Sequence, residues 1–277
     1  DATSIYKTYI RRELHPLILC SPFVHRCFTK PLGYAGDYEM INQLLAKAKL
    51  GNLLFAKLIN VLTLSVAPAV AHRNRINILH RVMTEEMARC TAEGKKLTAI
   101  NVACGPAQEV RNFMDTCTES DQCEITLLDL SPEALEFCRQ EIDEKRKTTG
   151  SLIKVNFLEK SIDMLLRESL MPRSDAGETG SQYQLVYCAG LFDYLTDSVC
   201  ERLISLFHDW VCPGGMLIVT NIHPSNPSRN FMDYILEWNV IHRTEKQLKD
   251  LCHKNGPMDV FSDETGVNIF LTMRKDA

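Results

Sequence analysis

Small and acidic residues stand directly after two apolar segments in the second part of the chain. The run Ala103-Cys104-Gly105-Pro106 closes the segment Leu97–Ala103, and Asp129 follows the segment Glu124–Leu128, 24 residues beyond Gly105. Gly105 permits a tight turn and a close approach of a ligand to the backbone. An acid at the end of a second strand is placed to accept hydrogen bonds from ribose hydroxyls. The spacing therefore indicates a nucleoside-binding site.

Structural explanations compete for these same residues. Gly105 alone could mark a plain turn from strand to helix, and Asp129 could cap the helix that follows. Ser131, directly before Pro132, already has the type and position of a helix cap, which leaves Asp129 free for a ligand. The chain lacks the full G-x-G-x-x-G pattern of a dinucleotide site, so an NAD-dependent reductase is disfavoured.

Three further strand ends carry candidate groups. Ser161 and Ile162 follow the third apolar segment and could contact an adenine, although Ser161 could equally cap a helix. His223 follows the fifth segment and is the best titrating candidate, whereas its structural alternative is a satisfied, partly buried histidine. Small, aromatic and acidic residues follow the fourth segment, namely Ala189, Gly190, Leu191, Phe192, Asp193 and Tyr194.

A parallel sheet is needed to gather these residues. From about Gly94 onward, apolar segments of strand length alternate with helical patterns, which predicts βαβ units. The last two segments, Met258–Ser262 and Asn268–Arg274, are too close for a crossover and must form an antiparallel hairpin. Since a ligand lies beyond the carboxyl ends of parallel strands, the candidate residues should share one site.

The chain before this sheet has a helical pattern. We expect a helical N-terminal lid or substrate-binding region over residues 1–93 and a catalytic α/β domain over residues 94–277. The most apolar segment, Leu53–Ala71, contains Lys57 and other polar residues. It predicts a buried or lid helix ended by Pro68 and no membrane span. Residues 171–182 are polar and rich in Gly and Ser, so we expect a loop there.

Composition restricts the function further. The 277 residues are 45% hydrophobic and 24% charged, which is ordinary for a soluble globular protein. A net charge of -4 gives no basic footprint of a nucleic-acid binder. Eleven cysteines without a C-x-x-C pair predict reduced thiols, a cytoplasmic location and no zinc site.

The segment Asn101–Pro106, Asp129 and a terminal hairpin containing Thr265–Asn268 together resemble the class I S-adenosylmethionine-dependent methyltransferases. The resemblance covers about residues 97–274. It implies a seven-stranded, mostly parallel Rossmann-like sheet with an antiparallel terminal hairpin, and S-adenosyl-L-methionine as the cofactor. Asn101 stands where the class usually has an acid, and two alanines replace its glycines.

A narrower resemblance extends over nearly the whole chain. The segments Pro31–Met40, Gly190–Leu195 and Asn221–Pro224, with Trp238 followed by Arg243, look like bacterial 3-hydroxypalmitic acid methyl ester synthases. Those enzymes make a quorum-sensing ester. The resemblance implies carboxyl methylation of a fatty acid, with the Gly-Tyr-Ala-Gly-Asp loop and the N-terminal helices as a lid.

Methyl transfer sets the roles of the side chains. The acceptor must be held in line with the methyl group at roughly 3–3.5 Å while water is excluded. A carboxylate acceptor is ionised at neutral pH and needs no base. A hydroxyl or amine would need one, and His223 or Asp193 could serve. Because arginine binds carboxylates, we expect Arg75 on the cofactor and Arg243 on the substrate, unless they are ordinary surface arginines.

We therefore expect a cytoplasmic methyltransferase that forms a methyl ester on a small acyl acid, with no metal and with homo-oligomers left open. The alternatives are O- or N-methylation of another small molecule or peptide, and an inactive cofactor-binding regulator. The expected catalytic residues are His223, Asp193 and Tyr194, and the expected substrate contacts are Tyr38, Phe192, Trp238 and Arg243. The expected cofactor contacts are Tyr34, Arg75, Ala103, Cys104, Gly105, Pro106, Asp129, Leu130, Ser161, Ile162, Ala189, Gly190 and Leu191.

Overall fold

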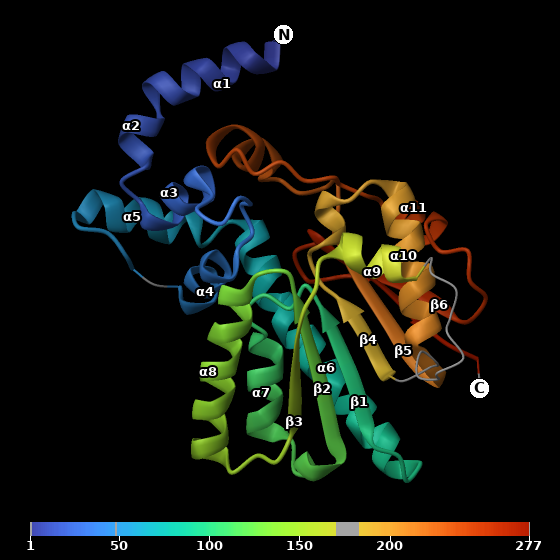
Figure 1. Ribbon diagram of the computed structural model, residues 1–277. Coiled ribbons are helices and arrows are strands. Elements are labelled where there is room, and N and C mark those ends of the chain that lie inside the picture. Colours follow the sequence, from blue (N-terminus) through green and yellow to red (C-terminus); the bar gives the residue numbers. More distant parts are fainter. Residues whose placement is uncertain (1, 48, 170–182, 277) are drawn as a thin grey trace.

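A seven-stranded sheet forms the centre of the computed structural model, which describes residues 2–47, 49–169 and 183–276 (Figure 1). The strand order is β3-β2-β1-β4-β5-β7-β6, with β1 to β5 parallel and β7 antiparallel to both β5 and β6. The predicted sheet and its terminal hairpin are confirmed. The loop expected at residues 171–182 lies outside the described residues. The strands are β1 (Leu97–Val102), β2 (Cys123–Asp129), β3 (Lys154–Glu159), β4 (Tyr183–Cys188), β5 (Val211–Ile222), β6 (Met258–Ser262) and β7 (Asn268–Arg274).

Helices cover both faces of the sheet. Alternate residues of β1 point into different cores, Leu97 and Ala99 into one and Ile100 and Val102 into the other, as the period of two in a strand requires. The first core is closed by α6 (Ala67–Ala92), α7 (Gln108–Thr116) and α8 (Pro132–Thr149). The second is closed by α9 (Ile162–Glu168), α10 (Asp197–Trp210) and α11 (Glu245–Asp250).

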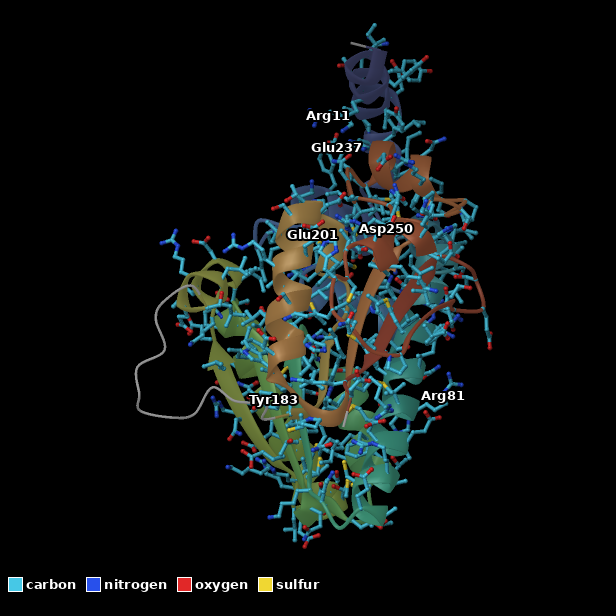
Figure 2. All side chains as sticks on the ribbon, turned by 90° about the vertical axis from the view of Figure 1, so that its right-hand side faces the viewer. Arg11, Arg81, Tyr183, Glu201, Glu237 and Asp250 are labelled. Carbon is cyan, nitrogen blue, oxygen red and sulfur yellow. The ribbon has the colours of Figure 1, made fainter. Side chains whose placement is uncertain are left out.

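The N-terminal helices lie over the carboxyl ends of the strands and form what we call the helical cap (Figure 1). Phe23, Met40 and Leu44 of the cap share a third core with Trp238, which follows the short π-helix η3 (Phe231–Ile235). An ion pair also joins these regions, with Arg11 Nε 2.6 Å from a carboxylate oxygen of Glu237 (Figure 2). The cap helices are α1 (Ala2–Glu13), α2 (His15–Ile18), α3 (Pro22–Thr29), α4 (Tyr38–Ala46) and α5 (Leu54–Thr63).

The apolar segment expected to form one helix forms parts of two. α5 ends at Thr63, and α6 begins at Ala67 with Pro68 in its first turn. The prediction that Pro68 ends a helix is wrong, because the first turn has no need of the N–H that proline lacks. No single helix in the described chain has the length and apolarity to cross a membrane; α5 and α6 meet that test only as a pair, bent by 59°.

α6 connects the cap with the sheet. Ala69 and Ala71 near its start belong to the core of the cap, whereas Leu79 and Met83 further along belong to the first core of the sheet. The residues between these two groups therefore lie where the cap meets the strand ends. The expected division of the chain at residues 93/94 stays a prediction.

Asn60 fixes α5 on α3. Its fully buried side chain accepts hydrogen bonds through Oδ1 from Ser21 Oγ at 2.8 Å and from the Phe23 N–H at 3.1 Å. Asn60→Ala should lower the free energy of unfolding by about 1–3 kcal/mol, because the buried Phe23 amide loses its partner. Chemical denaturation measures this loss. The control Asn52→Ala, at an exposed position before α5, should change stability by less than about 0.5 kcal/mol; equal losses would contradict the assignment.

Candidate active site

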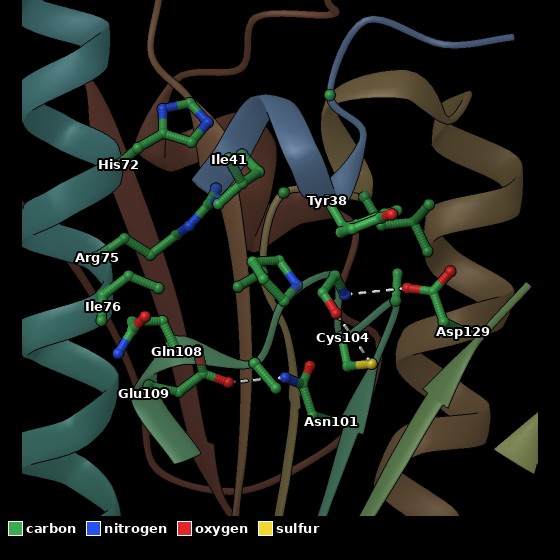
Figure 3. Close-up of a pocket in the computed structure, with 18 of the residues that line it drawn as sticks. Tyr38, Ile41, His72, Arg75, Ile76, Asn101, Cys104, Gln108, Glu109 and Asp129 are labelled. Atoms are coloured by element: carbon green, nitrogen blue, oxygen red, sulfur yellow. Dashed lines mark hydrogen bonds between the residues drawn. The ribbon is translucent and has the colours of Figure 1, made fainter. Parts of the chain in front are cut away.

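A cavity of about 340 Å³ lies between the cap and the carboxyl ends of β1, β2 and β4, where the sequence placed the site (Figure 3). Its wall combines the loops after these strands with α6, α4 and the loop before α4. Most of the predicted site residues meet there. Those that line the cavity are Tyr34, Tyr38, Arg75, Ala103, Cys104, Gly105, Pro106, Asp129, Leu130, Ala189, Gly190, Leu191, Asp193, Tyr194 and Trp238.

Asp129 is tied to two loops at one end of the cavity. Its Oδ2 accepts the Gly105 N–H at 2.9 Å and its Oδ1 accepts the Ser131 N–H at 3.0 Å. Ser131 caps α8 by accepting the Ala134 N–H, as predicted. Asp129 is therefore not free of protein contacts, but it is held in one orientation. A carboxylate has about four acceptor sites, so hydroxyl groups of a ligand can still donate to it.

The loop after β1 has a left-handed backbone at three positions. Gly105 has a φ of 52°, and Ala103 and Ala107 have φ values of 56° and 46°. The two alanines occupy positions where the class I methyltransferase motif has glycines. The loop therefore keeps a conformation that glycine favours, at a cost of roughly 1–2 kcal/mol for each alanine.

Arg75 is the one lysine or arginine of the described chain that lines this cavity. Its Nη1 is buried and has no hydrogen-bond partner among the described residues. Gly190 lies against it, and a Cβ added there would be 2.8 Å from Nη1. Burial lowers the pKa of Arg75, whereas the carboxyl groups of Asp193 and Glu109 act in the opposite direction. A buried guanidinium with an unused donor is suited to a carboxylate ligand.

Asp193 and Tyr194 form the other end of the cavity with Trp238. The indole Nε1 of Trp238 donates to the Tyr194 hydroxyl oxygen at 2.7 Å, so the Tyr194 proton can be given to a ligand. Burial raises the pKa of Asp193 to about 7, although the Ile222 N–H donates to it and Arg75 lies nearby. Near neutral pH this carboxyl group can therefore be neutral or ionised.

His72 also lines the cavity and was missed in the sequence. Its Nδ1 donates to the Pro68 carbonyl oxygen at 2.8 Å, which leaves Nε2 without a proton. Burial and the Arg75 charge lower the pKa of His72 to about 3, so the ring is neutral. The ring lies 5.8 Å from that of Trp238. His72 stands three residues before Arg75, so on a helix the two side chains share one face. This spacing could have predicted His72 as a cavity residue.

Glu109 and Asn101 are two further cavity residues outside the predicted set. Asn101 Nδ2 donates to Glu109 Oε1 at 2.8 Å (Figure 3). The buried Tyr187 hydroxyl donates to the same oxygen at 3.0 Å. Burial raises the pKa of Glu109. From the sequence alone, Glu109 would be interpreted as a structural residue, because an acid in the first turn of a helix commonly complements the helix dipole.

The structure contradicts the prediction that Arg243 holds a substrate carboxylate. Its side chain is buried outside the cavity wall, and its five N–H groups have protein acceptors. These are the carbonyl oxygens of Phe192 and Leu195 and the side chains of Asn221 and Asp197, at 2.7–3.0 Å. Arg243 therefore fixes the loop after β4 and does not bind a ligand.

Four more predicted residues do not reach the cavity. His223 has Nδ1 2.7 Å from Ser225 Oγ and Nε2 3.2 Å from a Glu245 oxygen, outside the cavity wall. Phe192 is fully buried in the second core. Ser161 caps α9, of which Ile162 is the first residue. The strand-end rule placed their backbones correctly, but their side chains point elsewhere, so the catalytic, substrate and cofactor roles predicted for them are not supported.

No family model and no curated protein matches the sequence. Solved structures match over most of the chain. A possible exported protein from Bordetella parapertussis has 17% identity and a TM-score of 0.65, covering 100% of this chain and 98% of its own. An O-methyltransferase family protein from Burkholderia thailandensis has 13% identity and a TM-score of 0.54, covering 96% and 76%. A magnesium protoporphyrin IX methyltransferase from Synechocystis PCC 6803, with bound S-adenosylhomocysteine, has 12% identity and a TM-score of 0.50, covering both chains fully. At these identities the likeness defines the fold, which is the Rossmann-like fold of class I methyltransferases.

Gly190 tests the geometry at Arg75. Gly190→Ala should weaken the binding of a carboxylate ligand, for which S-adenosylmethionine is the probe, at least about tenfold, because the new Cβ displaces the guanidinium. Gly214→Ala is the matched control, since Gly214 also has a positive φ but open space around it. Both changes should destabilise the fold by about 1–2 kcal/mol. Calorimetric titration and thermal unfolding separate the effects; equal affinities of the two variants would contradict the assignment.

Proposed function

We propose that this protein is an S-adenosylmethionine-dependent methyltransferase that acts on a small molecule. The observation that carries the proposal is the buried, unpartnered Nη1 of Arg75 in the same cavity as Asp129. A ligand with ribose hydroxyls at one end and a carboxylate at the other would meet both groups. The loop at Gly105 has no further glycine to cradle a pyrophosphate, which argues against a dinucleotide.

The residues present fit this cofactor. Arg75 would hold the carboxylate of its methionine part, and Asp129 would accept from its ribose hydroxyls. Bound S-adenosylmethionine supplies a methyl group on a sulfonium sulfur, which an acceptor in line with that bond can take. The cap residues Tyr38 and Ile41 line the cavity and would exclude water, and the Tyr194 hydroxyl would orient the acceptor.

The finer proposal is methyl ester formation on the carboxylate of a 3-hydroxy fatty acid, as the sequence resemblance implies. The apolar part of the cavity wall supports an acyl substrate; its members are Tyr38, Ile41, Ile76, Leu79 and Trp238. With Arg75 on the cofactor, the substrate carboxylate meets the neutral Tyr194 hydroxyl and no cation of the described cavity wall. A carboxylate that is not neutralised by a cation remains a good nucleophile.

Methylation of a hydroxyl or amine is the second candidate. It is favoured by the pKa of Asp193 near 7, which would let an ionised Asp193 take a proton from the acceptor. The bare Nε2 of His72 can accept a hydrogen bond from such a hydroxyl or amine, whereas its lowered pKa makes it a weak base. Three expectations from the sequence stay predictions. They are an inactive cofactor-binding regulator as the alternative function, a cytoplasmic location, and homo-oligomers.

The pH dependence of methyl transfer separates the two candidates. With methyl-labelled cofactor and a panel of acyl acids, we expect an alkali-labile product whose rate of formation falls as the pH rises through about 7. The physical reason is that ionised Asp193 repels the substrate carboxylate, which is itself ionised throughout this range. Asp193→Asn should remove the fall, because its amide does not ionise.

Other outcomes decide against this proposal in stages. An alkali-stable product whose rate rises through the same pH would identify Asp193 as a base for a hydroxyl or amine. Affinity for S-adenosylmethionine without transfer to any acceptor would favour the regulator. No affinity for S-adenosylmethionine would contradict the proposed function as a whole.

A further inference from the structure

Helix α5 has its apolar side outward. It buries the small or polar residues Ala56, Asn60 and Thr63, while Leu54, Leu58 and Leu62 are 85%, 52% and 56% exposed. These leucines are spaced by four and form one stripe along the helix. A surface helix of a soluble protein ordinarily has the opposite arrangement. Figure 1 shows α5 at the outer edge of the cap, away from β4 to β7.

The orientation of α5 is fixed by hydrogen bonds on its buried side. Asn60 is completely buried and accepts hydrogen bonds from Ser21 Oγ and the Phe23 N–H. Rotation of α5 to bury its leucines would leave the Ser21 hydroxyl and the Phe23 N–H without this partner. Buried polar groups in proteins are rarely left without a hydrogen bond. The outward leucines are therefore a built feature of the fold.

The residues within α5 and in the chain just before it add exposed apolar area and positive charge. Leu53 and Phe55 at the start of α5 are 69% and 50% exposed. Lys47, Lys49 and Lys57 are exposed as well, and none of them pairs with a carboxylate in the part of the chain that the structure describes. No Asp or Glu occurs in the sequence between Glu39 and Glu85. We call these five apolar and three basic residues the α5 face.

We propose that the α5 face binds the surface of a membrane that contains anionic lipids. Leucine and phenylalanine side chains would enter the boundary between headgroups and acyl chains, and the lysines would contact the anionic headgroups. The ten residues of α5 are too few to cross a bilayer, so the helix would lie in the plane of the surface.

The charge of the α5 face favours a lipid surface over a second copy of this chain. A two-fold interface places the same patch on both partners, so it would gather six lysines, and residues 40–84 of either copy contain no acid to pair with them. An anionic surface instead complements all three. This inference does not depend on the proposed chemistry, although an acyl substrate would be found at such a surface.

Vesicle sedimentation tests the proposal. The full chain should sediment with vesicles of phosphatidylcholine and phosphatidylglycerol, and much less with phosphatidylcholine alone. The double variant Leu54→Ser/Leu58→Ser should bind at least about tenfold more weakly, because it removes two inserting side chains. Leu152→Ser is the control, since Leu152 is 71% exposed in the loop before β3. This variant should bind the vesicles as the unchanged protein does.

Three results would overturn the proposal. They are no sedimentation of the unchanged protein, equal binding to neutral and anionic vesicles, and unchanged binding by the double variant. Light scattering supplies an independent check: a dimer that becomes a monomer in the double variant would show that the α5 face binds a second copy. Circular dichroism spectra should be the same for all variants, because both leucines are on the surface.

Discussion

The rest of the site depends on one buried charge, the Arg75 guanidinium packed against Gly190. Removing a guanidinium from water is costly unless hydrogen-bonded partners offset the cost. Asp193 and Glu109 lie near enough to act on its charge, yet Nη1 has no partner in the described structure. A ligand carboxylate would complete the set. The cavity is therefore built to gain free energy from an anionic group at one defined point.

The helix that carries Arg75 explains why this point is well defined. α6 has its first turns in the core of the cap and its later turns in the core of the sheet, so it fixes the cap relative to the strand ends. At the other end of the cavity, Asp129 is held by the Gly105 and Ser131 amides, which come from two different loops. The two ends are thus positioned by separate parts of the fold, and a ligand that contacts both would need a matching length and polarity.

The sequence predicted the sheet and the backbone positions of the site well, and the side chains less well. Strand periodicity and the short final connection are local features, so they fix the order of elements and the hairpin. The direction of a side chain depends on distant partners instead. Arg243 is saturated by acceptors 22 to 51 positions away, and Phe192 packs into the second core of the sheet. Pro68 is compatible with the end or the start of a helix, and only the packing of α5 and α6 decides between them.

The most direct test of the central claim compares S-adenosylmethionine with its decarboxylated form in calorimetric titrations. The unchanged protein should bind S-adenosylmethionine at least about tenfold more tightly, because only that ligand offers a carboxylate to Arg75. Arg75→Met should bind the two ligands equally. Arg73→Met should keep the preference, since Arg73 donates to the Leu44 and Leu64 carbonyl oxygens outside the cavity. Equal affinities in the unchanged protein, or a preference that survives in Arg75→Met, would contradict the assignment of Arg75 to the cofactor carboxylate.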